Sequence, residues 1–144
     1  TKYWNQPDAT AATIDAEGWL RTGDAGYLDE DGYLFIRDRV KDMIISGGEN
    51  IYPAEVENAV FDHPAVADVA VIGVPDDTWG EAVKACVVLK ADAVASEADL
   101  IKYARGKIAA YKCPKSVDFV DTLPRNPSGK VLRRELRSQY SKAS

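Results

Sequence analysis

The stretch DVAVIGVPDDTWGEAVKACVVLK, residues 68–90, contains two apolar runs separated by a short polar loop. The runs, at 68–74 and 82–90, are rich in valine, which fits the pleated backbone of a β-strand. The intervening PDDTWGE supplies proline, aspartate and glycine, which are typical of turns, and Trp79 is expected to anchor this loop as a buried side chain. The stretch therefore predicts two strands at the centre of a sheet.

Upstream of these strands, the sequence predicts a short strand and then a helix. MII, residues 43–45, is an apolar run that leads directly into SGGEN. A helix is expected to begin at Pro53, with two glutamates in its early turns, where the helix dipole favours acidic side chains. His63, followed by a proline, is expected to end that helix as a loop residue.

Downstream, the chain alternates between helix and strand once more. Ser96 and Asp99 have the spacing of a capping box and predict the start of a helix. SVDFVDTL, residues 116–123, predicts a third main strand, and a last helix is expected from Lys130 to about Tyr140.

These elements predict an α+β fold, a small compact domain with a central three-stranded sheet flanked by helices. An N-terminal β-hairpin is expected in AGYLDEDGYLFIRDRV, residues 25–40, with its tight turn at Asp31-Gly32. Residues 1–40 are too few to form a core of their own and have the character of the end of a larger domain. The predicted domain boundary therefore separates residues 1–40 from 41–144.

The composition excludes several classes of protein. The chain is 46% hydrophobic and 28% charged, as in ordinary globular proteins, and has no apolar run of about 20 residues that could cross a bilayer. Cys86 and Cys113 have no CxxC spacing, and DEDG at 29–32 lacks the further ligands of a calcium loop. We expect no metal site, no disulfide and no export signal, which favours a cytoplasmic location.

The end of the chain is basic, although the net charge of the whole chain is −5. The stretch lacks the series of aromatic side chains that would stack on bases, so nucleic acid is not an expected partner. A local contact with a phosphate or an acidic partner is expected instead. Against Glu135 alone, the basic side chains of residues 125–144 are Arg125, Lys130, Arg133, Arg134, Arg137 and Lys142.

Two glycine-containing stretches have the residue types of ligand-binding loops. Asp24, in RTGD at residues 21–24, has a carboxylate that can accept hydrogen bonds from a vicinal diol such as a ribose, or can cap its own turn. Gly47 and Gly48 allow the backbone to approach a slender ligand closely, or form a tight connection. Neither SGGEN nor LPRNPSGK has the GxxxxGK[ST] spacing of a phosphate-binding loop.

Lys130 lies in LPRNPSGKVLRREL, residues 123–136, directly after a Pro-Ser-Gly turn. One interpretation is a solvated cation at a helix start in a mobile loop. The other is a catalytic group, because a flexible ammonium suits phosphate oxygens that gain charge in a transition state. The residue by itself leaves both interpretations open.

Several stretches in this order resemble the C-terminal end of an acyl-CoA synthetase of the adenylate-forming superfamily, which also contains luciferases and peptide-synthetase adenylation domains. The resemblance covers nearly the whole chain. The stretches that carry it are GWLRTGDAGYLDEDGYLFIRDRVKDMIISGGENIYPAEVE (18–57), VAVIGVPDDTWGEAVKACVV (69–88), YKCPK (111–115) and LPRNPSGKVLRREL (123–136).

The resemblance implies a two-step reaction that uses ATP and coenzyme A, with Mg²⁺ accompanying ATP in the full enzyme. A carboxylic acid, by resemblance a fatty acid, attacks the α-phosphate of ATP and gives an acyl-adenylate and pyrophosphate. The thiol of coenzyme A then displaces AMP. In this superfamily a small C-terminal domain rotates on the large domain between the two steps.

The resemblance also implies roles for single residues. Asp24 matches the aspartate that holds the ribose hydroxyls, and Arg39 matches an arginine that contacts the nucleotide. Lys41 occupies the hinge position, Gly47 and Gly48 match the loop that lines the pantetheine tunnel, and Lys130 matches the lysine of the adenylation step.

The phosphate loop, acyl pocket and adenine-binding residues of the superfamily belong to the large N-terminal domain of the same enzyme, which is the implied partner. None of them occurs in this sequence, so the chain alone is expected to be inactive. An aryl-acid ligase and a peptide-synthetase adenylation domain remain alternatives. A non-catalytic module that binds an acidic partner through the basic end is the alternative from another class.

Overall fold

The computed structural model describes residues 3–140 and divides into two compact units. The first unit ends at Lys41 and the second begins at Asp42. A short 3₁₀ turn, η1 (Val40–Asp42), spans this boundary. Lys142, one of the basic residues noted above, lies outside the described residues.

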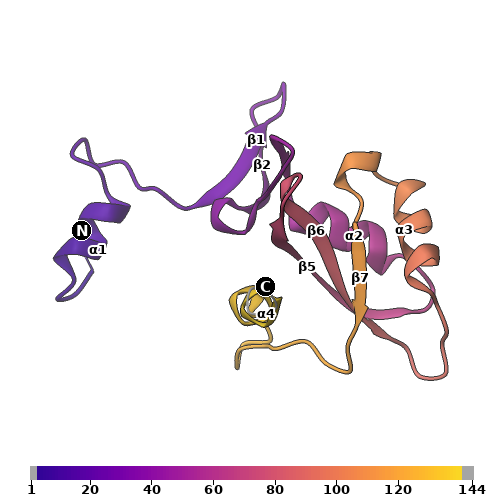
Figure 1. Cartoon of the computed structure of the whole chain (residues 1–144). Helices are drawn as coiled ribbons and strands as arrows, with labels where there is room; N and C mark the ends of the chain where they lie inside the picture. Colours follow the sequence, from indigo (N-terminus) through magenta and orange to yellow (C-terminus); the bar gives the residue numbers. More distant parts are fainter. Residues whose placement is uncertain (1–2, 141–144) are drawn as a thin grey trace. The chain divides into compact units, whose positions relative to one another are not determined.

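The first unit contains one short helix and the predicted hairpin (Figure 1). Helix α1 (Pro7–Thr13) precedes strands β1 (Asp24–Leu28) and β2 (Leu34–Arg39), which pair antiparallel. The turn between the strands is organised by Asp29, whose Oδ1 accepts hydrogen bonds from the N–H groups of Asp31 and Tyr33. Gly32 adopts a positive φ of 84° in this turn, as the predicted Asp-Gly turn requires.

The described part of the first unit has no buried side chain. Large apolar side chains are exposed along the hairpin and just before it, which is expected of a segment that packs against further protein. The most exposed of them are Trp19, Leu20, Leu28, Tyr33, Leu34 and Ile36.

The second unit is built on a five-stranded sheet in which the predicted 68–90 hairpin is the longest pairing. Strands β5 (Val66–Asp76) and β6 (Gly80–Leu89) pair antiparallel, and β7 (Ser116–Phe119) pairs parallel to β6. The α+β class and these three central strands are as predicted. The strand count differs, because β3 (Ile44–Ser46) and β4 (Glu49–Ile51) form a small hairpin that joins β6 through the pair Ser46 and Gly80.

Helices cover both faces of this sheet (Figure 1). The side chains of β5 alternate, so Val69 and Val71 belong to one apolar cluster and Ala70 and Ile72 to the other. Helices α2 (Pro53–Phe61) and α3 (Glu97–Arg105) pack on the first face, where the larger core lies. Helix α4 (Arg133–Tyr140) packs on the opposite face through Leu136.

The helix boundaries follow the expected signals at α2 and α3 but not at α4. Pro53 is the first residue of α2, and Ser96 and Asp99 form the predicted capping box. Helix α4 begins at Arg133, so the prediction of a helix from Lys130 was wrong by one turn. Residues before it form an isolated bridge between Arg125 and Val131, which holds them in an extended hairpin.

Two further structural observations concern function. No helix among residues 3–140 is long and apolar enough to cross a membrane. The same residues contain no group of three or more His, Cys, Asp or Glu side chains placed to hold a metal ion.

Another 3₁₀ turn, η2 (Ala110–Lys112), connects α3 to β7.

Candidate functional site

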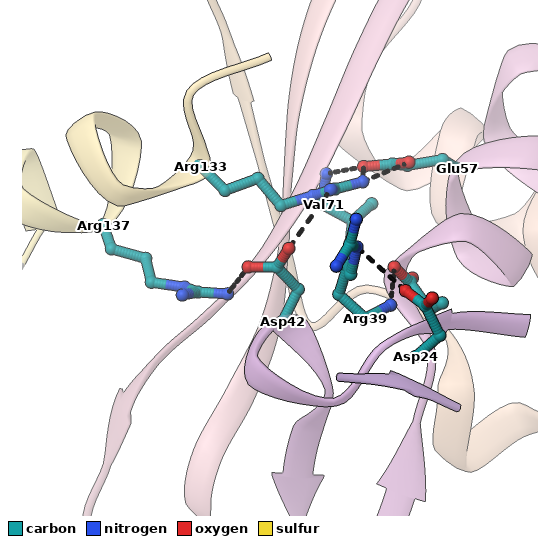
Figure 2. A network of polar contacts seen from close by, with 8 residues as sticks. Asp24, Arg39, Asp42, Glu57, Val71, Arg133 and Arg137 are labelled. Atoms are coloured by element: carbon teal, nitrogen blue, oxygen red, sulfur yellow. Dashed lines mark hydrogen bonds and ion pairs between the residues drawn. The ribbon is translucent and has the colours of Figure 1, made fainter. Parts of the chain in front are cut away.

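Asp24 and Arg39, both predicted to contact a nucleotide, form an ion pair at the end of the β1–β2 hairpin (Figure 2). They are cross-strand partners in the register, and Arg39 Nε lies 2.9 Å from Asp24 Oδ1. Arg39 also donates to the carbonyl oxygen of Thr22. Within the described residues, Asp24 Oδ2 has no hydrogen-bond partner, so one carboxylate oxygen is available to a hydroxyl group.

Gly47 and Gly48 form the two-residue turn between β3 and β4. Their φ angles are 60° and 84°, in the left-handed region that a two-residue hairpin of this type requires. The N–H of Gly47 donates to the carbonyl oxygen of Trp79, and Glu81 Oε2 accepts from the N–H of Ile45. These two contacts fix the glycine turn to the β5–β6 connection.

A small pocket of about 110 Å³ opens beside this turn. The indole of Trp79 lies against Gly47, and Lys115 Nζ lies 5.6 Å from the centre of the indole ring. Trp79 is 49% exposed, so the expectation of a buried anchor was wrong: its ring forms a wall of this pocket. The lining residues are Ser46, Gly47, Glu49, Trp79, Tyr111 and Lys115.

Substitution of the two glycines is expected to have unequal effects. Alanine at either position pays the cost of a left-handed conformation, about 1–2 kcal/mol. A Cβ on Gly47 would also lie 2.8 Å from Trp79 Cε3, whereas a Cβ on Gly48 meets no atom within 4 Å. Gly47→Ala should therefore destabilise the second unit more than Gly48→Ala, by roughly a further 1–3 kcal/mol. Hydrogen exchange of the β3 and β4 amides in each variant measures this difference; equal effects would contradict it.

Lys130 ends a closed turn rather than a mobile loop. Its N–H donates to Asn126 Oδ1 at 2.8 Å, and its carbonyl oxygen accepts from the N–H of Asn126 at 2.9 Å. Gly129, with φ of 82°, makes the tight return possible. The side chain of Lys130 is exposed and forms no ion pair or hydrogen bond with any residue between 3 and 140. Its backbone is held while its ammonium group is free to meet a ligand.

Two of the arginines that follow Lys130, Arg133 and Arg137, are engaged within the second unit (Figure 2). Arg133 Nη2 lies 2.8 Å from both carboxylate oxygens of Glu57 on α2, and Glu57 in turn accepts from the N–H of Val71. Because β5 pairs only with β6, Val71 lies on an edge strand, and Glu57 satisfies its N–H there. The Glu57–Arg133 pair thus joins helices on opposite faces of the sheet.

Asp42 completes this network. It is 8% exposed and accepts from Arg137 at 3.1 Å, with Arg133 Nη1 at 3.7 Å. Since Arg125 is also paired, with Asp68, three of the basic residues noted in the sequence are neutralised internally. These arginines are therefore not a free surface for an acidic partner.

The predicted thioester loop and the predicted adenylation lysine lie at opposite ends of the β5–β6 hairpin. Gly47 contacts Trp79, next to the Asp76–Gly80 pair that closes the hairpin. The turn of Lys130 is tied through Arg125 to Asp68, at the other end of β5. The eight residue steps from Asp68 to Asp76 span about 26 Å of strand.

The titratable groups elsewhere have structural partners. His63 accepts a hydrogen bond from the N–H of Ala65 at Nδ1 and meets Tyr103 edge-on, as a loop histidine does, beside a cleft of about 630 Å³ next to α3. Burial raises the pKa of the Cys86 thiol, and burial with a hydrogen bond to Asp118 raises the pKa of Tyr140. A hydrogen bond from Lys84 lowers the pKa of Asp118.

Sequence reasoning singled out Gly47, Gly48 and Lys130, and named Asp24 and Arg39 separately without predicting that they pair. It did not predict that three further side chains lie beside the glycines. Trp79, Tyr111 and Lys115 come from three separate segments, and their shared pocket depends on the β3–β4 hairpin, which was not predicted. The only signal in the sequence was the exact spacing of two short strand-like runs around two glycines.

Comparison with known proteins identifies the second unit. The AMP-binding enzyme C-terminal domain family matches residues 55–130, just over half of the chain. A long-chain-fatty-acid–CoA ligase, FadD13, of Mycobacterium tuberculosis is 53% identical over 140 residues, covering 97% of this chain and 27% of the relative. A 2-succinylbenzoate–CoA ligase of Bacillus cereus is 53% identical over 135 residues, covering 94% of this chain and 27% of the relative.

A solved structure agrees with this. ATP-bound MatB from Rhodopseudomonas palustris superposes with a TM-score of 0.90 at 42% identity, over 98% of this chain and 28% of that chain. The chain thus spans only about a quarter of the length of the relatives that it matches. It belongs to the AMP-binding enzyme C-terminal domain family and corresponds to the C-terminal part of acyl-CoA ligases.

Proposed function

We propose that this chain is the C-terminal part of an ATP-dependent acyl-CoA synthetase whose substrate is a fatty acid. The full enzyme converts an acid, ATP and coenzyme A to acyl-CoA, AMP and pyrophosphate through an acyl-adenylate. Residues 1–40 are the last segment of its large domain, residues 41–144 are the mobile domain, and Lys41 is the hinge. The division of the chain after Lys41 supports this boundary.

The separation of the Lys130 turn from the glycine turn is the observation that carries the proposal. The two turns contact opposite ends of one hairpin, near Asp68 and near Asp76, and about 26 Å of strand separates these two residues. A single reaction centre cannot contact both at once. Rotation of this unit between the two half-reactions would bring Lys130 to the centre for the first and the glycine turn for the second.

In the adenylation step, Lys130 contacts the carboxylate and the α-phosphate and offsets the charge that develops as pyrophosphate leaves. Asp24 accepts hydrogen bonds from the ribose hydroxyls, and Arg39, held by Asp24, contacts the nucleotide near the ribose. Mg²⁺ accompanies ATP. The described part of the chain has no cluster of ligands for a metal of its own.

In the thioester step, Gly47 and Gly48 let the pantetheine arm pass close to backbone. A Cβ on Gly47 would lie 2.8 Å from Trp79 Cε3, so glycine at this position lets the indole pack directly against the turn that lines this passage. The indole of Trp79 offers an apolar wall to the arm, and Lys115 offers a cation to the phosphates of coenzyme A.

The alternative is an aryl-acid–CoA ligase, which the similarity to a 2-succinylbenzoate–CoA ligase favours as directly as FadD13 favours a fatty acid. The acyl pocket, which would decide between a fatty acid and an aryl acid, belongs to the large domain, the proposed partner of this chain. A non-catalytic module that binds acidic partners is disfavoured, because Arg125, Arg133 and Arg137 pair internally. We infer a cytoplasmic location from the proposed use of ATP and coenzyme A.

The test is acid-dependent ATP–pyrophosphate exchange by the full-length protein. Long-chain fatty acids are expected to support exchange at least about 10-fold better than benzoate-type acids. The reason is that each methylene group missing from an apolar acyl pocket costs roughly 1–3 kcal/mol of transition-state binding. Exchange that depends on aromatic acids alone would establish the alternative. No exchange with any carboxylic acid would overturn the proposed reaction.

A further inference from the structure

The turn that carries Lys130 is clamped to the sheet by one arginine. Arg125 Nη1 donates to the carbonyl oxygen of Gly129, the residue before Lys130. Arg125 Nη2 donates to Asp68 Oδ2 on β5. A single guanidinium thus connects the backbone next to the lysine with the central sheet, and its planar fork suits two fixed acceptors.

Asp68 is itself oriented. Its Oδ1 accepts a hydrogen bond from the N–H of Val69 at 3.0 Å, which leaves Oδ2 to Arg125. Asp68 lies at a register shift in the pairing of β5 with β6, where the strand bends and the side chain is redirected. Since β5 pairs with β6 along its length, the carboxylate is mounted on a rigid element.

The other contacts of the turn lie within the loop or at its base. Asn126 closes the loop on itself, and Leu123 and Val131 pack its base against the apolar cluster under α4. None of these three residues ties the tip of the turn to β5. The Arg125 bridge does so, at the carbonyl adjacent to Lys130.

We propose that Arg125 and Asp68 are positioning residues for the adenylation step, which hold the Lys130 turn at a fixed angle to the sheet. This inference rests on the proposed role of Lys130. A lysine side chain has a long flexible stem, so its ammonium group can be positioned accurately only if the backbone that carries it is fixed. Misplacement of a reacting group by about 1 Å can lower a rate by about 100-fold.

The experiment uses the full-length enzyme with Asp68→Ala, Arg125→Ala and the double variant. Acid-dependent ATP–pyrophosphate exchange is measured at saturating ATP, and thioester formation is measured separately from supplied acyl-adenylate. We expect kcat of exchange to fall about 10- to 100-fold in each single variant, with thioester formation within about 2-fold of wild type. The double variant should be no worse than the poorer single, because both act through one bridge.

Asp62 and Lys107 provide the matched control. They form an ion pair at 2.6 Å between the α2–β5 connection and the residues just after α3. Their side chains are partly exposed, as those of Asp68 and Arg125 are, with the two cations at 37% and 40%. Asp62→Ala and Lys107→Ala should leave both half-reactions unchanged. Asp68→Glu keeps the carboxylate and should recover part of the exchange activity.

Three outcomes would overturn the inference. Exchange that is unchanged in the single variants removes the positioning role, and equal loss in both half-reactions indicates a merely structural contact. Additive losses in the double variant exclude a shared bridge. If Lys130→Ala itself spares exchange, the assignment of Lys130 fails first, and this separate result distinguishes failure of the proposed function from failure of the clamp.

Discussion

Lys130→Ala in the full-length enzyme is expected to lower acid-dependent ATP–pyrophosphate exchange by about 100- to 1,000-fold while thioester formation from supplied acyl-adenylate persists. The physical reason is that the ammonium group meets charge that develops only in the transition state of adenylation. Removal of one such preorganised donor costs about 3–4 kcal/mol. The two half-reactions, assayed separately at saturating substrates, measure the split.

The fold of the domain should not change, because the contacts of Lys130 in the described structure are made by its backbone. Its N–H and carbonyl oxygen bond to Asn126, and alanine retains both groups. Loss of activity in this variant would therefore report on the ammonium group rather than on the turn.

Arg134 is the matched control for charge. It is an exposed cation four residues away on α4, and no residue in the described range bonds to its side chain. Arg134→Ala should leave exchange within about 2-fold of wild type, as expected for a surface residue away from the reaction. Equal loss in Lys130→Ala and Arg134→Ala would show a general effect of positive charge, and activity that persists in both would make Lys130 a surface cation.

The strands and helices that could be predicted are those with long or well-marked patterns. The valine-rich runs of β5 and β6 are continuous and buried, so they can be recognised as strands without an alternating pattern. The Ser96–Asp99 capping box marks the start of α3 directly. The short strand predicted at 43–45 corresponds to β3, but β4 and its pairing with β3 were missed, because three residues are too few for a periodic pattern. Lys130 was placed in a helix because the extended pairing of Arg125 with Val131 has no local signature.

The candidate site was predictable only where neighbouring residues in the sequence form it. Gly47 and Gly48 are adjacent, and their turn follows from residue type alone. The clamp joins Asp68 to Arg125, 57 residues apart, and depends on how the chain returns to the start of β5. A contact of that kind follows from tertiary packing, which a single sequence does not encode in any local pattern.

Asp42→Ala is expected to destabilise α4 strongly, even though Asp42 lies far from α4 in the sequence. The carboxylate is 8% exposed and is shared by Arg133 and Arg137. Removal of one member of a buried ion pair typically costs about 3–5 kcal/mol, because the remaining charges lose their compensation. The partial exposure of Arg137 places the expected loss near the lower end, about 3 kcal/mol.

Hydrogen exchange of the α4 amides in the full-length protein measures this effect. A loss of about 3 kcal/mol in the free energy of local opening corresponds to exchange roughly 100-fold faster in residues 133–140. Asp62→Ala removes an exposed ion pair outside this network and should leave α4 unchanged. Unchanged exchange of α4 in Asp42→Ala would mean that Glu57 alone holds Arg133. A selective loss would instead show that the first residue after Lys41 anchors the helix that follows the Lys130 turn, so that the proposed hinge and the proposed catalytic segment share one ionic network.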